Sequence, residues 1–417
     1  MKKTIKIIII TLLSLIALIT ITLTVLFTFF RDDNTSADES KSVPLTPVTE
    51  EPQFVSLTPV SEEFDSIALT TNMNMPDSIR RNLEDYDYLV SLVEMNYAPF
   101  SAIMEKGYEQ EYRAMRKQLR QQVINEEIGI EKAASDYVFW FYSRFDKHIG
   151  IYTETFGKTA NTLFPKDIEI VDYAPKAVSC KVDSCTWLIR VPSCDLSFTE
   201  RTNDAFQQFV ESGCENLIID IRGNGGGVNV IWNNYYAALY DHPSKPNITW
   251  LRNTPENLEA WERYVDPNHP KKEWIQNFLN RCKSSKKEFV KVGVWTGDCG
   301  LQTTAHINRA AVLIDWNTAS AAESLVTFVK ECSDRAKVYG ICNTSGCELT
   351  GECVFGALPN SKIELLYATT IGSMFYEHDF SNSPGIAPDI IIPLPYATTL
   401  TDNIDEWVLW VAEDLKR

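Results

Sequence analysis

The sequence predicts a mixed α/β fold with a small helical bundle at its N-terminal side. From residue 186 onward, short apolar runs of strand length alternate with helical patterns, and this order is typical of a parallel sheet with helices on its faces. In residues 76–147, apolar side chains instead recur at helical spacing in three successive runs, which indicates helices that pack against one another. We therefore expect a helical domain at 76–147 and an α/β domain at 148–417.

The length and composition of the chain fit two folded domains. Of its 417 residues, 44% are hydrophobic and 11% are aromatic, which is enough to fill real cores. The formal net charge is -17, whereas a nucleic-acid binder needs clustered Lys and Arg to displace counterions. We therefore expect no nucleic-acid partner.

Residues 1–30 have the features of a membrane anchor or signal segment. Residues 7–30 form an apolar run about as long as a bilayer-spanning helix, and Lys2, Lys3 and Lys6 precede it. The positive-inside tendency leaves the N-terminus in the cytoplasm and the rest of the chain outside. A cleaved signal peptide is the alternative, but the run lacks an obvious small-x-small cleavage site. We expect a single-pass protein of the cell membrane whose folded part is periplasmic or extracellular.

Residues 31–75 have the composition of a disordered acidic linker. They are rich in Pro and Thr, show neither helical nor strand periodicity, and contain a short repeat in which residues 43–51 return in similar form at residues 55–63. Such a composition cannot bury enough apolar area to order itself. We expect this segment to hold the folded part away from the membrane.

The apolar pattern also gives the order of the elements. In the helical domain, the inward side chains are Leu83, Tyr86, Val90, Val93 and Tyr97, then Tyr108, Tyr112, Met115, Leu119 and Val123, and finally Ala133, Tyr137, Trp140 and Phe141. In the α/β domain, we expect strands at Thr186–Val191, Asn216–Ile221, Ala311–Ile314 and Lys337–Gly340, one strand ending in Gly385–Asp389, a helix at Thr202–Ser212, and a last helix with Ile404, Trp407, Val408, Val411 and Leu415 on one face. An insertion at residues 228–300, in which Thr254 and Pro255 open a helix, interrupts this domain.

Two turns that follow predicted strands carry residues suited to chemistry. One holds Gly223 and Gly225–Gly227, which leave the backbone free to approach a ligand closely. An oxyanion hole, a phosphate cradle lacking the usual Lys-Ser/Thr, and a simple tight turn are the possible interpretations. In the other turn, Ser320 precedes a helix whose first N–H groups would stabilise a negative charge, which makes it a candidate nucleophile. Ser320 and Glu323 also match a capping box, so a purely structural helix cap is the alternative.

All ten cysteines lie beyond residue 179, in the part expected outside the cytoplasm. Their spacings do not form paired C-x-x-C zinc motifs, and no H-E-x-x-H sequence occurs, so we expect neither a metal nor another cofactor. Disulfide bonds fit an oxidising compartment better than a metal site does. We therefore expect disulfide bonds, whose pairing the sequence leaves open.

Three stretches together resemble one family. Residues 217–227 (LIIDIRGNGGG), 318–323 (TASAAE) and 385–389 (GIAPD) are similar to the signature blocks of the C-terminal processing, or tail-specific, serine peptidases. That superfamily also includes the tricorn protease core and retinoid-binding relatives. The resemblance covers roughly residues 76–400. No PDZ module, which many processing proteases carry, is evident before the catalytic core.

The resemblance implies a ClpP/crotonase-like catalytic core. Ser320 would be its nucleophile, and the backbone N–H groups of Gly226 and Ala321 would form the oxyanion hole. Relatives with a lysine base carry it in a block that corresponds to residues 341–346 here, where no lysine occurs. The branch that resembles the tricorn core uses a histidine where the helices meet the catalytic domain, and His148 occupies that place.

The third catalytic residue is left open by the resemblance. Relatives with the histidine often carry a glutamate three residues before the glycine of the last block, and Asn382 stands there in this chain. Asn382 could still orient an imidazole, as an asparagine does in papain-like enzymes. Asp379 and Asp146 are the alternatives.

The leading hypothesis is a serine endopeptidase that acts on polypeptides outside the cytoplasm through an acyl-enzyme. Ser320 would be the nucleophile and His148 the base. A non-catalytic binding protein for peptides or apolar ligands, as the retinoid-binding relatives suggest, is the alternative from a different class. An acyl hydrolase acting on esters is a third hypothesis.

Overall fold

The computed structural model describes residues 75–160, 163, 172–263, 272–303, 305–380 and 385–417. The predicted anchor, residues 31–74 of the predicted linker and Asn382 lie outside these residues. Within them, no helix combines the length and the apolar character needed to cross a bilayer.

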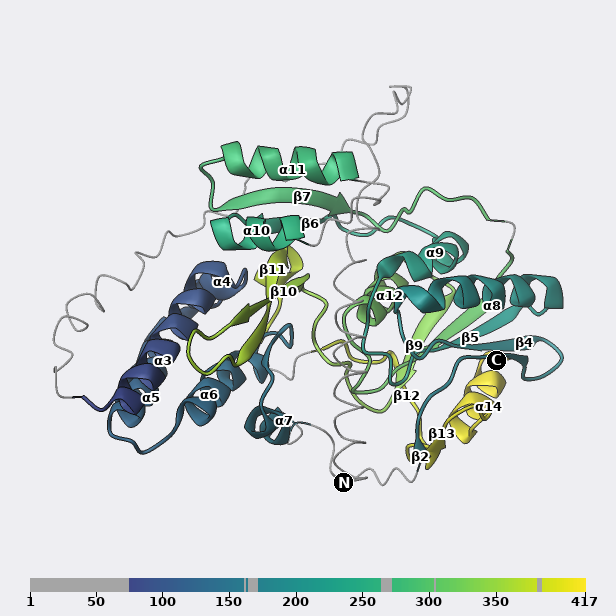
Figure 1. Cartoon of the computed structure of the whole chain (residues 1–417). Coiled ribbons are helices and arrows are strands. Elements are labelled where there is room, and N and C mark those ends of the chain that lie inside the picture. Colours follow the sequence, from purple (N-terminus) through teal and green to yellow (C-terminus); the bar gives the residue numbers. More distant parts are fainter. Residues whose placement is uncertain (1–74, 161–162, 164–171, 264–271, 304, 381–384) are drawn as a thin grey trace.

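The N-terminal helices form where the apolar periodicity predicts them (Figure 1). They are α3 (Asp77–Asn96), α4 (Phe100–Ile103), α5 (Glu109–Ile124) and α6 (Ile130–Tyr142), with a π-helical turn at Met104–Tyr108. Their buried aromatic rings pack edge to face, as Tyr97 and Phe141 do with ring centres 5.7 Å apart. The helical region expected at the N-terminal side is thus confirmed.

The first of two large sheets packs against these helices and is antiparallel throughout. It contains β1 (Ile149–Ile151), β6 (Asn247–Arg252), β7 (Phe289–Trp295), β10 (Thr350–Ala357) and β11 (Glu364–Gly372), in the order β1-β11-β6-β7 with β10 also on β11. Four further helices accompany it: α7 (Glu154–Ala160), α10 (Pro255–Arg263), α11 (Lys272–Ser284) and α13 (Met374–Glu377). Residues 228–300 therefore supply two strands and two helices to this part, whose core they share with α3, α5 and α6. We call this part the helical body.

The second sheet has the parallel order that the alternating pattern predicts. It runs β12-β9-β8-β5-β4-β3, and β3 is its antiparallel edge strand. The bounds are β3 (Val178–Lys181), β4 (Thr186–Arg190), β5 (Asn216–Asp220), β8 (Arg309–Leu313), β9 (Ala336–Gly340) and β12 (Ile390–Ile391). The mixed α/β class is confirmed. We call this part the α/β body.

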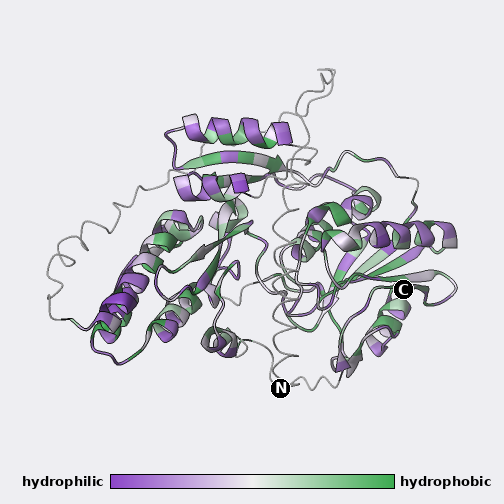
Figure 2. Cartoon of the chain, in the orientation of Figure 1, coloured by the Kyte–Doolittle hydropathy of each residue, from purple (hydrophilic) through white to green (hydrophobic). Residues whose placement is uncertain are grey.

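Helices cover both faces of the parallel sheet because successive strand residues point to opposite faces. On one face, Ile219 and Val312 pack under α8 (Thr199–Ser212), α9 (Asn233–Leu239) and α12 (Ala321–Cys332). On the other face, Ile218 and Leu313 pack against α14 (Glu406–Asp414), beside the short pair β2 (Asp172–Tyr173) and β13 (Thr399–Leu400). Figure 2 shows hydrophobic residues on the inner strands and hydrophilic residues on the outer sides of α3 and α8.

The expected disulfide bonds are absent. All ten cysteines belong to the described part of the chain, and each is free. Cys194, Cys214 and Cys332 lie in the core beneath α8 and α12, where a thiol serves as a small apolar side chain. Cys282 lies instead in the core of the helical body, so buried cysteines contribute to packing in both bodies.

Two details of the C-terminal elements also differ from expectation. Residues 385–389 form no strand, because Gly385 has a φ of +97° and Pro388 has no N–H to donate; β12 follows this block. Ile404 is 37% exposed because α14 begins only at Glu406, whereas the other expected apolar residues of this helix are buried.

Candidate active site

Ser320 lies in the sharp turn between strand β8 and helix α12. Its φ of 53° and ψ of -120° are strongly disfavoured for a residue with a side chain. A strained serine between a strand and a helix is the arrangement in which other hydrolases expose a nucleophile. The turn therefore holds the Ser320 hydroxyl at the helix N-terminus at a cost in backbone strain.

Glu323 stabilises this turn and caps helix α12, as the sequence pattern predicted. The buried Glu323 carboxylate accepts the Ser320 N–H at 2.8 Å, the Thr344 hydroxyl at 2.6 Å, and the N–H groups of Gly346 at 2.6 Å and Cys347 at 2.8 Å. Burial raises the pKa of Glu323, and these four donors oppose that rise. One carboxylate thereby ties the serine turn to the segment at 344–347.

The last of the three signature blocks joins the same structure. Thr344 N–H donates to Ile386 O at 3.0 Å, and Ile386 N–H donates to the Thr344 hydroxyl at 2.8 Å. A Cβ at Gly385 would lie 2.2 Å from Thr344 O, so only glycine fits there. The block at 385–389 therefore supports the segment that Glu323 holds.

The glycine loop at 223–227 packs directly on the serine turn. Ala319 N–H donates to Asn224 O at 2.9 Å, and a Cβ at Gly226 would lie 2.7 Å from Ser320 Cβ. Gly226, with a φ of +96°, must therefore be glycine. Its N–H, however, donates to Asn224 Oδ1 at 2.9 Å and is already used within the loop.

Two other backbone N–H groups are better suited to hold an oxyanion than that of Gly226. Gly227 and Ala321 both line the cavity that contains Ser320. Within the described residues, neither N–H has a hydrogen-bond partner. This geometry moves the expected donor in the glycine loop from Gly226 to Gly227 and keeps Ala321.

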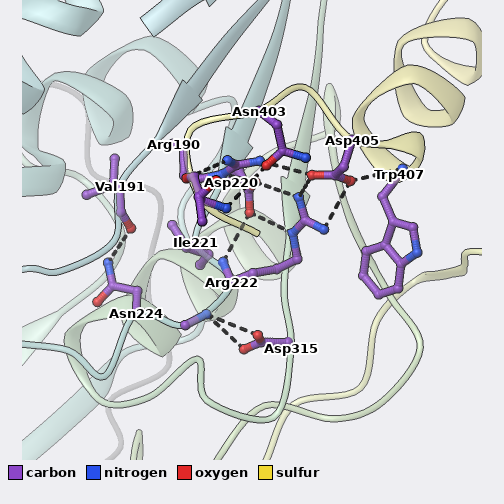
Figure 3. A network of polar contacts seen from close by, with 12 residues as sticks. Arg190, Val191, Asp220, Ile221, Arg222, Asn224, Asp315, Asn403, Asp405 and Trp407 are labelled. Carbon is purple, nitrogen blue, oxygen red and sulfur yellow. Dashed lines mark hydrogen bonds and ion pairs between the residues drawn. The ribbon is translucent and has the colours of Figure 1, made fainter. Parts of the chain in front are cut away.

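A buried ion-pair network anchors the start of the glycine loop (Figure 3). Arg222 donates to Asp220 and to Asp405, each at 2.7 Å, and Arg190 donates to the same two carboxylates at 2.6 and 3.0 Å. All four side chains are at most 1% exposed. Despite burial, the two arginines hold the pKa of Asp220 well below its usual value.

Asp315 fixes the other side of the loop. Its carboxylate accepts the Gly223 N–H at 3.0 Å, as Figure 3 shows, and the hydroxyls of Tyr173 at 2.7 Å and Tyr396 at 2.8 Å. Burial raises the pKa of Asp315. The glycine loop is thus held between two sets of buried carboxylates before any ligand arrives.

The structure brings His148 to Ser320. His148 lies just before β1 in the helical body, and its Nε2 is 3.0 Å from Ser320 Oγ. Its side chain is 13% exposed. The site therefore forms where the helical body meets the α/β body.

Thr350 and Asp146 complete a chain of hydrogen bonds behind His148. Thr350 Oγ1 donates to Asp146 Oδ1 at 2.8 Å and lies 3.0 Å from His148 Nδ1. Since the threonine proton points to Asp146, its oxygen accepts Nδ1–H, which leaves Nε2 free to accept the serine proton. Asp146 itself is 3.8 Å from Nδ1, too far for a direct hydrogen bond.

Asp146 is held in turn by two further donors. Tyr97 OH donates to its Oδ2 and the His148 N–H to its Oδ1, both at 2.9 Å. Burial raises the pKa of Asp146, and these hydrogen bonds counteract the rise. Asn382, Asp379 and Asp146 were the three candidates for the residue that orients the imidazole. Of these, Asp146 is connected to the imidazole, through Thr350.

The remaining candidates do not join the site. Asp379 does not line the cavity, and Asn382 lies outside the described residues. Lys330 and Lys337, the lysines nearest to Ser320 along the following chain, do not line the cavity either, so neither is a base for Ser320. Thr350 was missed by the sequence reasoning because a lone threonine 202 residues from its partner carries no signal.

The cavity around Ser320 has a volume of about 270 Å³ and is lined by both bodies. Among the residues that the structure describes, no group of His, Cys, Asp and Glu side chains could hold a metal ion.

The comparison with known families agrees with this geometry. Residues 186–392, which include the glycine loop, Ser320 and Thr350, match peptidase family S41. The chain contains a peptidase family S41 domain. Peptidases of this family are serine proteases. His148 and Asp146 lie before the matched residues, so the S41 domain meets them at the edge of the helical body.

Solved structures similar to the chain include several proteases. A serine-to-alanine mutant of CPAF is 13% identical, with a TM-score of 0.51, and the match covers 76% of this chain and 94% of that one. A photosystem II D1 C-terminal processing protease is 20% identical, with a TM-score of 0.32 over 50% of this chain and 42% of that one. The tricorn protease is 14% identical, with a TM-score of 0.28, and the match covers 56% of this chain and 18% of that one.

The likeness to CPAF shows a shared fold around the S41 domain and nothing finer. The chain spans less than half the length of the photosystem protease. No curated protein sequence matches the chain.

Proposed function

We propose that the chain is a serine endopeptidase, with Ser320 as nucleophile, His148 as base and a polypeptide as substrate. The main observation behind this proposal is the 3.0 Å contact between His148 Nε2 and Ser320 Oγ. It is supported by the hydrogen bonds through Thr350 to Asp146, which favour the tautomer that a base requires. A serine that merely capped its helix would need no such partner.

The reaction follows from this arrangement. His148 Nε2 takes the Ser320 proton as Oγ attacks the peptide carbonyl, and the N–H groups of Gly227 and Ala321 hold the oxyanion. The imidazolium then gives its proton to the leaving amine, which leaves an acyl-serine. Water, deprotonated by the same imidazole, hydrolyses the acyl-serine and restores the free enzyme. The Asp146 carboxylate, acting through Thr350, stabilises the imidazolium.

The test is labelling with a fluorophosphonate probe, which phosphonylates an activated serine. We expect the native protein to be labelled, Ser320→Ala to remain unlabelled, and His148→Gln to react about 100-fold more slowly or worse, because a general base contributes about 10²- to 10⁴-fold. Labelling that persists in Ser320→Ala would overturn Ser320 as the nucleophile. An unlabelled but folded wild type would overturn the peptidase proposal and favour the binding-protein alternative.

We also propose that the S41 domain acts outside the cytoplasm, tethered by residues 7–30. The apolar run and the lysines before it support this topology. Disulfide bonds would have indicated an oxidising compartment, but the cysteines are free, so the proposal rests on the N-terminal sequence. Protease accessibility tests it in intact cells or, where an outer membrane is present, in spheroplasts, since a folded part that stays protected until the cytoplasmic membrane is lysed contradicts the topology.

A further inference from the structure

Two cavities with shared walls run along one side of helix α12. The larger contains Ser320 and His148, and the smaller has a volume of about 50 Å³. Ser324 lines both, and Thr327 lines the smaller one, so the helix side that begins at Ser320 continues into it. With a rise of about 1.5 Å per residue, Thr327 lies roughly 10 Å further along the helix than Ser320. A long side chain that enters beside Ser320 fits this path.

Glu348 lines both cavities and lacks a cationic partner in the described part of the chain. Its carboxylate has one weak hydrogen bond there, from the Thr327 hydroxyl at 3.4 Å. The nearby Lys330 pairs with Asp389 instead. A half-buried carboxylate that lines the same cavity as the candidate nucleophile thus has most of its hydrogen-bonding capacity unused.

Asn229 supplies an independent second observation. It lines both cavities, its residue is 6% exposed, and its side-chain oxygen is buried without a hydrogen-bond partner among the described residues. A buried acceptor without a donor costs free energy that a ligand with N–H groups would recover. The walls shared by the two cavities therefore offer two acceptors with unused capacity, the Glu348 carboxylate and the Asn229 side-chain oxygen.

The walls of the smaller cavity suit the stem of a long side chain. Tyr236, Trp295 and Met374 line it and supply apolar surface. Lysine and arginine bury an aliphatic stem along such surface while their charged end makes hydrogen bonds. A carboxylate, an amide oxygen and apolar walls together match a basic side chain.

We propose that Glu348 and Asn229 bind an arginine or lysine side chain of the substrate, on the residue whose carbonyl Ser320 attacks. This inference rests on the proposed peptidase function and adds the substrate class. The charged end of the side chain donates to Glu348 and to the Asn229 oxygen, and the stem lies against the smaller cavity's apolar wall.

The other charged groups around the cavities are consistent with a cationic ligand. Lys147 and Glu352 line the larger cavity only. Burial and the nearby Glu323 and Glu331 carboxylates raise the pKa of Glu348. A bound cation favours the ionised carboxylate, so the preference for a basic side chain strengthens as the pH rises through that pKa.

The test compares three peptides that differ only at the residue before the scissile bond, which is arginine, norleucine or glutamate. We expect kcat/KM to be highest for arginine, lower for norleucine and lowest for glutamate. Glu348→Gln keeps the shape and removes the charge, so the arginine-to-norleucine ratio should fall about 10- to 100-fold, the range that charge-assisted hydrogen bonds supply. Glu331→Gln removes a nearby charge that lines neither cavity, and should change the ratio by less than about threefold.

Fluorophosphonate labelling of the same proteins separates the two proposals. A wild type that is labelled and cleaves the norleucine peptide as well as the arginine peptide overturns the basic-residue inference and leaves the peptidase function standing. Equal losses on both peptides in Glu348→Gln also overturn it, since they indicate a structural role. A folded wild type that is not labelled at Ser320 instead contradicts the peptidase function itself.

Discussion

Thr350 connects two groups that do not touch directly. The Asp146 carboxylate is 3.8 Å from the imidazole, yet the Thr350 hydroxyl lies within 3.0 Å of both. A hydroxyl can accept from the ring and donate to the carboxylate at once, which a methyl group cannot do. The orientation and tautomer of His148 therefore depend on a neutral residue at the first position of β10.

Replacing Thr350 by valine tests this dependence, because the two side chains have nearly the same shape. Loss of a hydrogen bond to a buried group costs about 1 to 3 kcal/mol, so we expect fluorophosphonate labelling of Ser320 to slow by about 10- to 100-fold. Thr350→Ser keeps the hydroxyl and should retain most of the rate. Equal rates in the valine variant and the wild type would show that the imidazole is oriented without Thr350.

At the residue scale, the sequence predicted the positions that carry recognisable spacing. Ser320 stood in a strand-turn-helix pattern, and His148 stood at the edge of the helices; the structure brings them together. Gly226 was predicted as the oxyanion donor and lies in the loop beside Ser320, but only the structure reveals that its N–H already donates to Asn224 Oδ1. Thr350 could not be found, because its partner is distant in sequence and threonine at a strand start is ordinary.

The turn between β8 and α12 stores strain at a single residue. Ser320 is one of four non-glycine residues with positive φ in the described chain, and its conformation is held by the Glu323 carboxylate and by Gly226 behind it. Residues in such regions cost about 1 to 3 kcal/mol and persist only where their surroundings enforce them. The strain thus belongs to the element, and a glycine would relieve it.

A comparison of Ser320→Gly with Ser320→Ala measures that strain apart from the chemistry. At a positive φ, glycine should be about 1 kcal/mol more stable than alanine in urea unfolding. At Ser324, one turn into the helix, the order should reverse, because glycine costs about 1 kcal/mol relative to alanine in a helix interior. Alanine equal to or better than glycine at Ser320 would contradict the strain.

At the element scale, local patterns predicted most strands and helices but not how they assemble. The alternation of apolar residues gave β4, β5, β8 and β9 within a residue or two, because both faces of that sheet are buried. The insertion at 228–300 was predicted as an addition to the α/β domain, whereas its strands pair with β11 and each other in the helical body. Strand pairing between distant segments leaves no periodic trace in either one.

At the scale of the whole molecule, the buried network of Figure 3 joins the C-terminal helix to the glycine loop. Asp405 caps α14 through the Trp407 N–H and binds both Arg190 and Arg222, so two arginines face two carboxylates. Because the folded-state pKa of Asp220 is depressed, its stabilising contribution is present above about pH 4 and is lost as the pH falls through the folded-state value.

Asp405→Asn should destabilise the folded protein at this network, because it leaves two buried guanidinium groups facing one carboxylate. Breaking a buried ion pair in this way costs about 3 to 5 kcal/mol, which is a large share of the stability of a typical domain. We expect the variant to lose that much in urea unfolding at pH 7 and to label poorly at Ser320, since Arg222 directly precedes the glycine loop. Asp402→Asn is the matched control, because Asp402 is 67% exposed and contacts Lys176 at 3.5 Å and the Thr401 hydroxyl at 3.2 Å, both at the surface. It should unfold like the wild type. Similar stability in both variants would mean that α14 does not hold the loop.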